Sequence, residues 1–197
     1  MPRPSVRDKI LDAGVQVLWK SGYAGAGVRD IVAMAGARPG SFTNHFSSKE
    51  EFASEVIDRY FSYVRGLVDE ALSDKSLSAP ERLRRYVDTI TMKLADADWA
   101  RGCLIGNLSL ETATHSELLR SRLAETFEQW RMPFATCIAE GQERGEITSK
   151  FRAEELADFF LSGWHGAMLR MKVSRSPEPL EHFKNVVFHT LFPKDSQ

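Results

Sequence analysis

The chain has 197 residues, of which 43% are hydrophobic, and its formal net charge is −1. That length is enough for one compact body or for a small domain fused to a larger one, and the balanced charge excludes a uniformly basic protein. Two cysteines, Cys103 and Cys137, are too few for a disulfide framework, and their spacing matches no zinc motif. The sequence has no signal peptide and no apolar run of bilayer length, so we expect a cytoplasmic protein without membrane contact.

The charge is unevenly spread along the chain. The first 50 residues carry seven Lys or Arg and four Asp or Glu, a net of +3, whereas the remaining 147 carry a net of −4. A basic end on an acidic body predicts a polyanionic partner for that end.

Apolar residues recur at helical spacing almost throughout the chain, and no segment shows sustained strand alternation. The pattern therefore predicts an all-α protein of about nine helices. In chain order these are a helix from Val6 that ends at the Ser-Gly-Tyr of 21–23, then Val28–Ala35, a short helix from Pro39, a long helix from Lys49, one after the Ser-Ala-Pro-Glu of 78–81, Leu104–Thr112, Ser116–Arg144, Ala153–Met171 and Pro179–Leu191.

The stretch RPGSFTNHF, residues 38–46, combines two aromatic residues with small and polar ones. Phe42 and Phe46 are four residues apart, so they share one helical face and can anchor the segment. Pro39 suits the first position of a helix, where its missing N–H costs nothing. The segment is therefore predicted to present its polar side chains outward.

The first three helices have the form of a helix-turn-helix, with Gly36 as a left-handed residue in the turn. The second helix of such a unit enters the major groove of DNA, and two copies are needed to bind a full site. Gly40 permits close approach to phosphate. Lys49 and the helix N-terminus at the Ser48–Glu51 capping box are predicted to bind phosphate as well. A polar surface helix in an ordinary bundle fits this pattern equally well.

Residues 10–52 resemble the DNA-binding domain of the tetracycline-repressor family of bacterial regulators. The match consists of the Gly-Tyr that closes the first helix, the Val-Arg-Asp-Ile of the second, the Ala-Gly before the turn, the Gly-Ser-Phe and His-Phe of the reading segment, and the Ser-Lys-Glu-Glu that follows. Three positions depart from the family pattern: Gly27 replaces a capping Ser or Thr, Arg38 replaces a frequent serine, and Thr43 replaces a tyrosine that touches phosphate.

The resemblance implies a DNA-binding domain over residues 1–48 and a helical ligand-binding and dimerisation domain over 49–197. Its partners would be a double-stranded DNA operator, a small-molecule inducer or electrophile, and a second copy of the chain. The residues expected to contact DNA are Arg29, Arg38, Pro39, Gly40, Ser41, Thr43, Asn44, His45 and Lys49.

The resemblance also implies that the last two helices form a four-helix dimer interface. The sequence agrees, because these helices carry more large apolar residues than one small core needs. We expect the interface to include Phe159, Phe160, Gly163, Phe183, Val186 and Val187. The alternative is that all of them belong to the core of a single chain.

Cys103 lies in the stretch RGCLIGNLSLE at the predicted start of a helix. A helix N-terminus and the neighbouring Arg101 both favour a reactive thiolate, whereas spacing alone favours a small buried hydrophobic residue. Gly-Cys-Leu here, with MKVSRSPEPLE at 171–181, resembles a subgroup that responds to electrophiles, oxidants or acrylate-type compounds. That likeness implies Cys103 as sensor and Lys172 as its charge partner.

Noncovalent ligand sensing without thiol chemistry is the competing hypothesis for the body. Aromatic and thioether side chains at helical spacing are candidates to line an apolar cavity, although such residues more often form core. They are Trp99, Trp130, Phe134, Trp164 and Met168.

Two further function classes compete with a DNA-binding repressor that a small molecule or thiol modification releases. One is a helical enzyme with Cys103 as nucleophile and a His base, and the other is a helical interaction module that ignores DNA. No phosphate loop, metal-ligand spacing, Ser-His-Asp set or carboxylate pair stands out, so we expect no cofactor, no metal and no catalysis.

Overall fold

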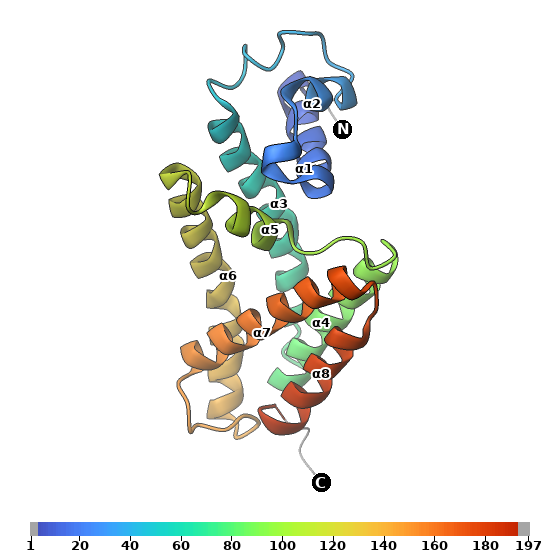
Figure 1. Ribbon diagram of the computed structural model, residues 1–197. Helices are drawn as coiled ribbons and strands as arrows, with labels where there is room; N and C mark the ends of the chain where they lie inside the picture. Colours follow the sequence, from blue (N-terminus) through green and yellow to red (C-terminus); the bar gives the residue numbers. More distant parts are fainter. Residues whose placement is uncertain (1–3, 193–197) are drawn as a thin grey trace. The chain divides into compact units, whose positions relative to one another are not determined.

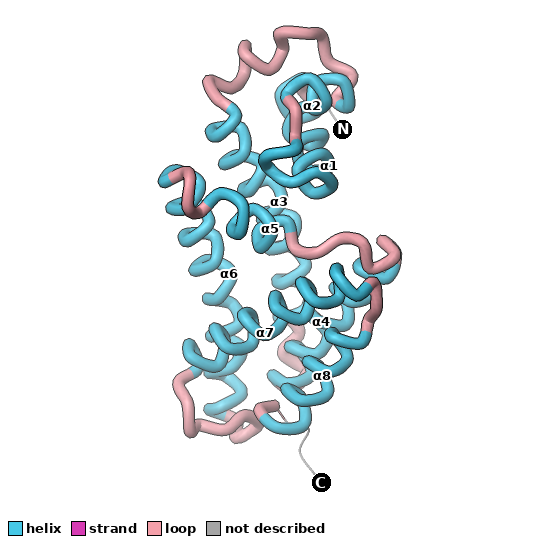
Figure 2. Tube along the Cα trace, viewed as in Figure 1, coloured by secondary structure: helices cyan, strands magenta, loops and turns pink. Residues whose placement is uncertain are grey.

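The computed structural model describes residues 4–192 and contains only helices, turns and loops in that range (Figure 1, Figure 2). The prediction of an all-α fold is therefore confirmed for the described chain. The helices are α1 Val6–Gly25, α2 Val28–Met34, α3 Lys49–Leu72, α4 Ala79–Ala95, α5 Leu104–Thr112, α6 Glu117–Glu143, α7 Ala153–Ser174 and α8 Glu178–Thr190.

The chain divides into two compact units that are discontinuous in sequence. The first contains the residues up to Tyr63 together with Leu104–Thr126, and the second contains Val64–Cys103 and the residues from Phe127 onward. Helices α3 and α6 each contribute one part to either unit. The sequence-based division into 1–48 and 49–197 remains a prediction.

Side-chain caps set the start of several helices. Ser5 and Asp8 form a reciprocal capping box at α1, and Ser78 and Glu81 form another at α4. At α3 the Ser48 hydroxyl oxygen accepts from the Glu51 N–H at 3.0 Å. The Glu51 carboxylate, however, accepts from the N–H and hydroxyl of Ser47, so the capping box predicted for Ser48 forms only in one direction.

The core of the first unit joins α1, α2 and α3. Ile10, Ile31, Phe52 and Val56 have no exposed surface. Gly14 permits the close approach of α1 to α3, because a Cβ atom at this position would lie 2.3 Å from the Phe52 ring.

An aromatic cluster forms the core of the second unit. Tyr86 from α4 lies 4.9 Å from Phe134 of α6, and Phe134 lies 5.6 Å from Phe160 of α7, measured between ring centroids. Trp164 is fully buried beside Phe183 of α8, at 5.4 Å. These rings bring α4, α6, α7 and α8 into one hydrophobic body.

The segment between α2 and α3 differs from its prediction. The sequence predicts a helix with Pro39 in its first position, but residues 39–45 form consecutive turns (Figure 2). Gly40 adopts φ +87°, which no right-handed helix accommodates, so the helix cannot begin at Pro39. A single helical turn closes further on, where the Phe46 N–H donates to the Phe42 carbonyl at 2.9 Å. The described chain consequently has eight helices in place of about nine.

Candidate nucleic-acid interface and ligand region

The turn segment 35–48 is anchored by its two phenylalanines, as the sequence predicts. Phe42 and Phe46 are buried, and their ring centroids lie 5.0 and 4.9 Å from that of Phe52 on α3. The guanidinium of Arg7 lies over the Phe46 ring at 5.2 Å and pairs with Glu55. The segment is thus held from both α1 and α3 although it lacks a regular helix.

The polar residues of the segment lie mainly at the surface. Thr43, Asn44 and His45 are exposed, whereas Ser41 is half-buried. The Thr43 hydroxyl donates to the Gly40 carbonyl at 3.0 Å, which leaves its oxygen free to accept. Asn44 and His45 therefore have the exposure that contact with base edges requires.

Several of the predicted DNA-contacting residues gather around one groove of about 520 Å³ between α2 and the turn segment. Arg29, Pro39, Gly40 and Thr43 all line it. Arg29 and Arg38 are exposed, and neither forms an ion pair with another residue within 4–192. Two uncompensated guanidinium groups beside an accessible glycine backbone are suited to phosphate oxygens.

Lys49 lies apart from this groove. Its ammonium group donates to the Tyr23 carbonyl at 2.7 Å and sits 4.6 Å from the centroid of the Tyr23 ring. The sequence predicts Lys49 as a phosphate contact, but in the structure its charge is directed to the end of α1.

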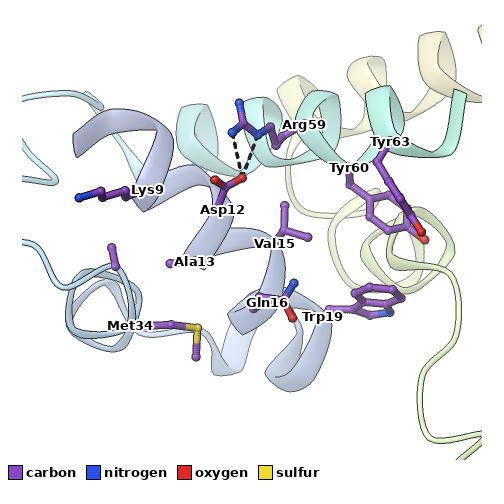
Figure 3. A pocket seen from close by; sticks show the side chains of 11 residues that line it. Lys9, Asp12, Ala13, Val15, Gln16, Trp19, Met34, Arg59, Tyr60 and Tyr63 are labelled. Atoms are coloured by element: carbon purple, nitrogen blue, oxygen red, sulfur yellow. Dashed lines mark hydrogen bonds and ion pairs between the residues drawn. The ribbon is translucent and has the colours of Figure 1, made fainter. Parts of the chain in front are cut away.

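A second groove, of about 690 Å³, lies between α1, the end of α2 and α3 within the first unit (Figure 3). The Arg59 Nη2 and Asp12 Oδ1 atoms are 2.9 Å apart across it, and the rings of Trp19 and Tyr60 meet edge to face at 5.4 Å. These two contacts link α1 to α3 along the groove. They therefore help to fix the support on which α2 packs.

Glu111 of α5 also contacts α1, and the sequence analysis did not single it out. Its Oε2 accepts from the backbone N–H groups of Tyr23 and Ala24 at 2.7 and 3.2 Å. The sequence analysis named the Gly-Tyr pair at the end of α1, which is one partner in this contact. No local pattern marked Glu111, because the two partners are 88 residues apart.

In the second unit, Cys103 is buried directly before α5 and forms no disulfide. It is 8% exposed and lies near Tyr86, which is fully buried. Lys172, its predicted charge partner, lies half-buried in the last turn of α7. Cys137 is also buried, and burial raises the pKa of its thiol to about 11, so it is protonated at neutral pH.

The aromatic residues proposed as a ligand lining belong chiefly to the core. Trp130, Phe134, Trp164 and Met168 are at most 4% exposed, and Trp99 is half-buried. Trp99 takes a left-handed backbone conformation, with φ +56°. His165 packs edge to face against Trp130, with ring centroids 4.9 Å apart, and burial lowers its pKa to about 4.

The residues predicted for the dimer interface separate into two groups. Phe160 and Val187 are at most 3% exposed, Phe160 in the aromatic core and Val187 among the residues that line the groove between α7 and α8. Phe159 and Val186 are about 60% exposed on the rim of an apolar groove of about 500 Å³ between α7 and α8. Gly163 and Phe183 line the same groove, and a Cβ atom on Gly163 would meet Phe183 at 2.8 Å.

Two structural features are absent from residues 4–192. No helix there is both long and apolar enough to cross a membrane. No three His, Cys, Asp or Glu side chains come together within the same range in a way that could hold a metal ion.

Helices, turns and loops throughout the described residues, with a helix-turn-helix near the N-terminus, form the fold of a DNA-binding transcriptional regulator. Residues 10–56 match the family of bacterial regulatory proteins described as the tetR family, and residues 79–187 match the tetracyclin repressor-like C-terminal domain. The chain belongs to the tetR family, and it is a DNA-binding transcriptional repressor. Regulators of this family bind DNA operators, typically as homodimers with small-molecule ligands.

Relatives and solved structures agree with this assignment. The chain is 42% identical to the HTH-type transcriptional repressor DhaR of Mycobacterium sp. strain GP1, over 98% of this chain and 96% of that protein. A crystal structure of a regulatory protein TetR from Rhodobacter sphaeroides matches with a TM-score of 0.87 and 32% identity, over 92% and 96% of the two chains. The reduced form of NemR from E. coli matches with a TM-score of 0.85 and 26% identity, over 98% and 100%.

Proposed function

We propose that this protein is a homodimeric repressor that leaves its operator when a small electrophile modifies Cys103. The observation that carries the proposal is the burial of this thiol. Cys103 is 8% exposed beside the fully buried Tyr86, so an adduct on its sulfur must displace core side chains. The similarity to NemR, of which a structure is described as the reduced form, supports a regulator that contains a chemically modifiable group.

In this proposal, the two arginines and the turn segment carry the contact with DNA. Asn44 and His45 read base edges, because both are exposed on a segment held by Phe42 and Phe46. Arg29 and Arg38 bind phosphates without giving up an ion pair of their own. The backbone at Gly40 approaches the duplex closely, since nothing lies within 4 Å of the place where its side chain would be.

The second copy docks on the groove between α7 and α8. Phe159 and Val186 expose large apolar surfaces on its rim, and they become buried when two such faces meet. Two copies are required because one short reading segment buries too little surface to hold DNA alone.

The modification is an addition of the thiol across an activated carbon–carbon double bond. The thiolate sulfur forms a bond to the β-carbon, the π electrons move to the α-carbon, and that carbon then takes the proton that the thiol released. No oxidant or further reactant is required. The adduct adds volume at a closely packed site, which destabilises the arrangement that binds DNA.

The test compares Cys103→Ser with Cys137→Ser in the full chain. Each protein is bound to a fluorescent duplex from the chain's own upstream DNA and treated with N-ethylmaleimide, while anisotropy reports release and mass spectrometry reports adducts. We expect one adduct per chain and release of wild type and Cys137→Ser, because the pKa of about 11 keeps the Cys137 thiol protonated and unreactive at neutral pH. Cys103→Ser should stay bound.

Three outcomes would overturn the proposal. Release of Cys103→Ser at the wild-type reagent concentration would eliminate this thiol as the sensor. Continued binding of a wild-type protein that carries the Cys103 adduct would favour noncovalent ligand sensing. Repeated turnover of the electrophile would identify an enzyme, whereas a sensor consumes one equivalent.

A further inference from the structure

The end of α1 contains a break that exposes backbone donors. Gly22 adopts φ +71° within α1, so the helical hydrogen-bond pattern is interrupted there. The N–H groups of Tyr23 and Ala24 directly follow this break, and the first donors after a break in a helix need an acceptor outside it. These two residues lead through Gly27 directly into α2, the first helix of the helix-turn-helix.

The missing acceptor is a carboxylate from a distant part of the chain. Glu111 Oε2 accepts both N–H groups, at 2.7 and 3.2 Å. The carboxylate fills the space beside Gly22, where a Cβ atom would lie 2.3 Å from Glu111 Oε1. A charged acceptor on two backbone donors forms stronger hydrogen bonds than a neutral one.

Lys49 also contacts Tyr23, through the carbonyl group and the ring of that residue. Its ammonium donates to the Tyr23 carbonyl at 2.7 Å and lies against the Tyr23 ring. Tyr23 is thus fastened to α5 through its N–H and to α3 through its carbonyl. All of these residues lie within the first compact unit.

We infer that Glu111 and Lys49 are positioning residues for DNA binding, which hold Tyr23 and thereby set the start of α2. Neither needs to touch DNA in this role. The inference rests on the membership of the tetR family and not on the proposed release through Cys103, so either can fail while the other holds.

Three substitutions at Glu111 separate positioning from a simple effect of charge. Glu111→Gln removes the charge but keeps an oxygen that can accept both N–H groups, and Glu111→Asp keeps the charge but shortens the reach. Glu111→Ala removes the charge and the accepting oxygen together. If Glu111 acts by positioning, Glu111→Ala and Glu111→Asp should weaken operator binding about tenfold, because hydrogen bonds to a charged group are lost. Glu111→Gln should stay within about threefold of wild type.

A pure charge effect gives a different order. Removing a negative charge favours binding to polyanionic DNA, so Ala and Gln would both bind more tightly than wild type, and Asp would equal wild type. Either that order or unchanged binding of all three variants would overturn the role of Glu111. Because Glu111 is exposed, we expect all three to fold, which circular dichroism and thermal unfolding verify.

Glu50→Gln is the matched control. Glu50 is an exposed carboxylate in the first turn of α3. Burial raises the pKa of the Tyr23 hydroxyl and the nearby charge of Glu50 adds to the rise, but no hydrogen bond joins Glu50 to the Tyr23 backbone within the described chain. Its loss should leave binding equal to wild type or slightly tighter. Weakening as large as that of Glu111→Ala would show that any carboxylate of this region has the same effect, and would overturn the inference.

Lys49→Met tests the other contact by its dependence on salt. Affinity for the upstream duplex is measured by anisotropy over a series of KCl concentrations. A lost phosphate contact would reduce the slope of log K against log salt by about 0.9 per contact. Positioning predicts weaker binding, about tenfold, with the wild-type slope. A reduced slope would assign Lys49 to phosphate, and unchanged affinity would remove it from DNA binding altogether.

Discussion

Individual residues in the second unit depart from their ordinary ionisation because of burial. The Nε2 atom of His165 is buried without a hydrogen-bond partner among the described residues, between the rings of Phe127 and Trp130. Desolvation lowers its pKa from 6.5 to about 4, although a hydrogen bond with the Leu161 backbone acts in the opposite direction. His165 is therefore neutral in the folded protein at physiological pH.

This residue makes stability depend on pH in a defined direction. Between pH 6.5 and 4 the unfolded chain binds a proton at His165 that the folded chain does not, so acidification favours unfolding. The contribution is fully present above pH 6.5 and is lost as pH falls toward 4. Since the residue keeps partial solvent access, we expect a loss of about 1–2 kcal/mol in the free energy of unfolding between pH 7 and 5.

Urea unfolding at several pH values measures this effect. His165→Gln should flatten the dependence between pH 7 and 5, whereas His45→Gln, which replaces an exposed histidine, should retain it. Identical pH profiles for wild type and His165→Gln would contradict the assignment.

At the scale of elements, the packing of α1 on α3 depends on a missing side chain. Gly14 faces α3, and a Cβ atom there would approach the Phe52 ring to 2.3 Å and the Val56 side chain to 2.9 Å. Phe52 also supports Phe42 and Phe46, so a shift of its ring reaches the turn segment. The geometry of the reading segment thus depends on how closely two long helices approach each other.

Gly14→Ala should therefore destabilise the protein although alanine favours helix. We expect a loss of about 1–3 kcal/mol from overpacking, measured by chemical denaturation. Gly66→Ala is the control, because Gly66 lies in the interior of α3 with nothing within 4 Å of its added Cβ atom. That substitution should stabilise the protein by about 0.5–1 kcal/mol. Equal effects of both would show that packing at Gly14 is unimportant.

At the scale of the whole molecule, the exposed apolar surface of α7 and α8 points to an assembly of two chains. Phe159 and Val186 lie on the rim of one groove, and the small residues Gly163 and Gly166 line it. A twofold interface brings the same patch of both chains together. Dimerisation would bring two reading segments to successive major grooves, about 34–36 Å apart.

Charge placed on this surface should separate the copies. Phe159→Asp combined with Val186→Asp buries two carboxylates per chain at the contact, so we expect the dimer dissociation constant to rise at least about a hundredfold. Sedimentation velocity would show a monomer that no longer holds operator DNA. Phe151→Asp, at a phenylalanine that is 53% exposed outside the groove, should remain dimeric. A dimeric double variant would place the interface elsewhere.

The sequence by itself determined the features that depend on neighbours along the chain. Helical periodicity predicted the helices other than the one expected from Pro39, Ser48 caps α3 as predicted, and the spacing of Phe42 and Phe46 predicted their shared burial. The motifs from the Gly-Tyr pair to the Ser-Lys-Glu-Glu were sufficient for the family. Such signals are local, because caps and shared helical faces involve residues at most a few positions apart.

Only the tertiary structure decided which of two adjacent residues enters the core and which distant groups meet. Phe160 is buried and Phe159 exposed because successive helical residues point about 100° apart, and the sequence does not say which of them faces inward. The positive φ of Gly40 prevents the helix that was expected to begin at Pro39. The contact of Glu111 with Tyr23 joins residues 88 apart, so it exists only after α5 has packed against α1.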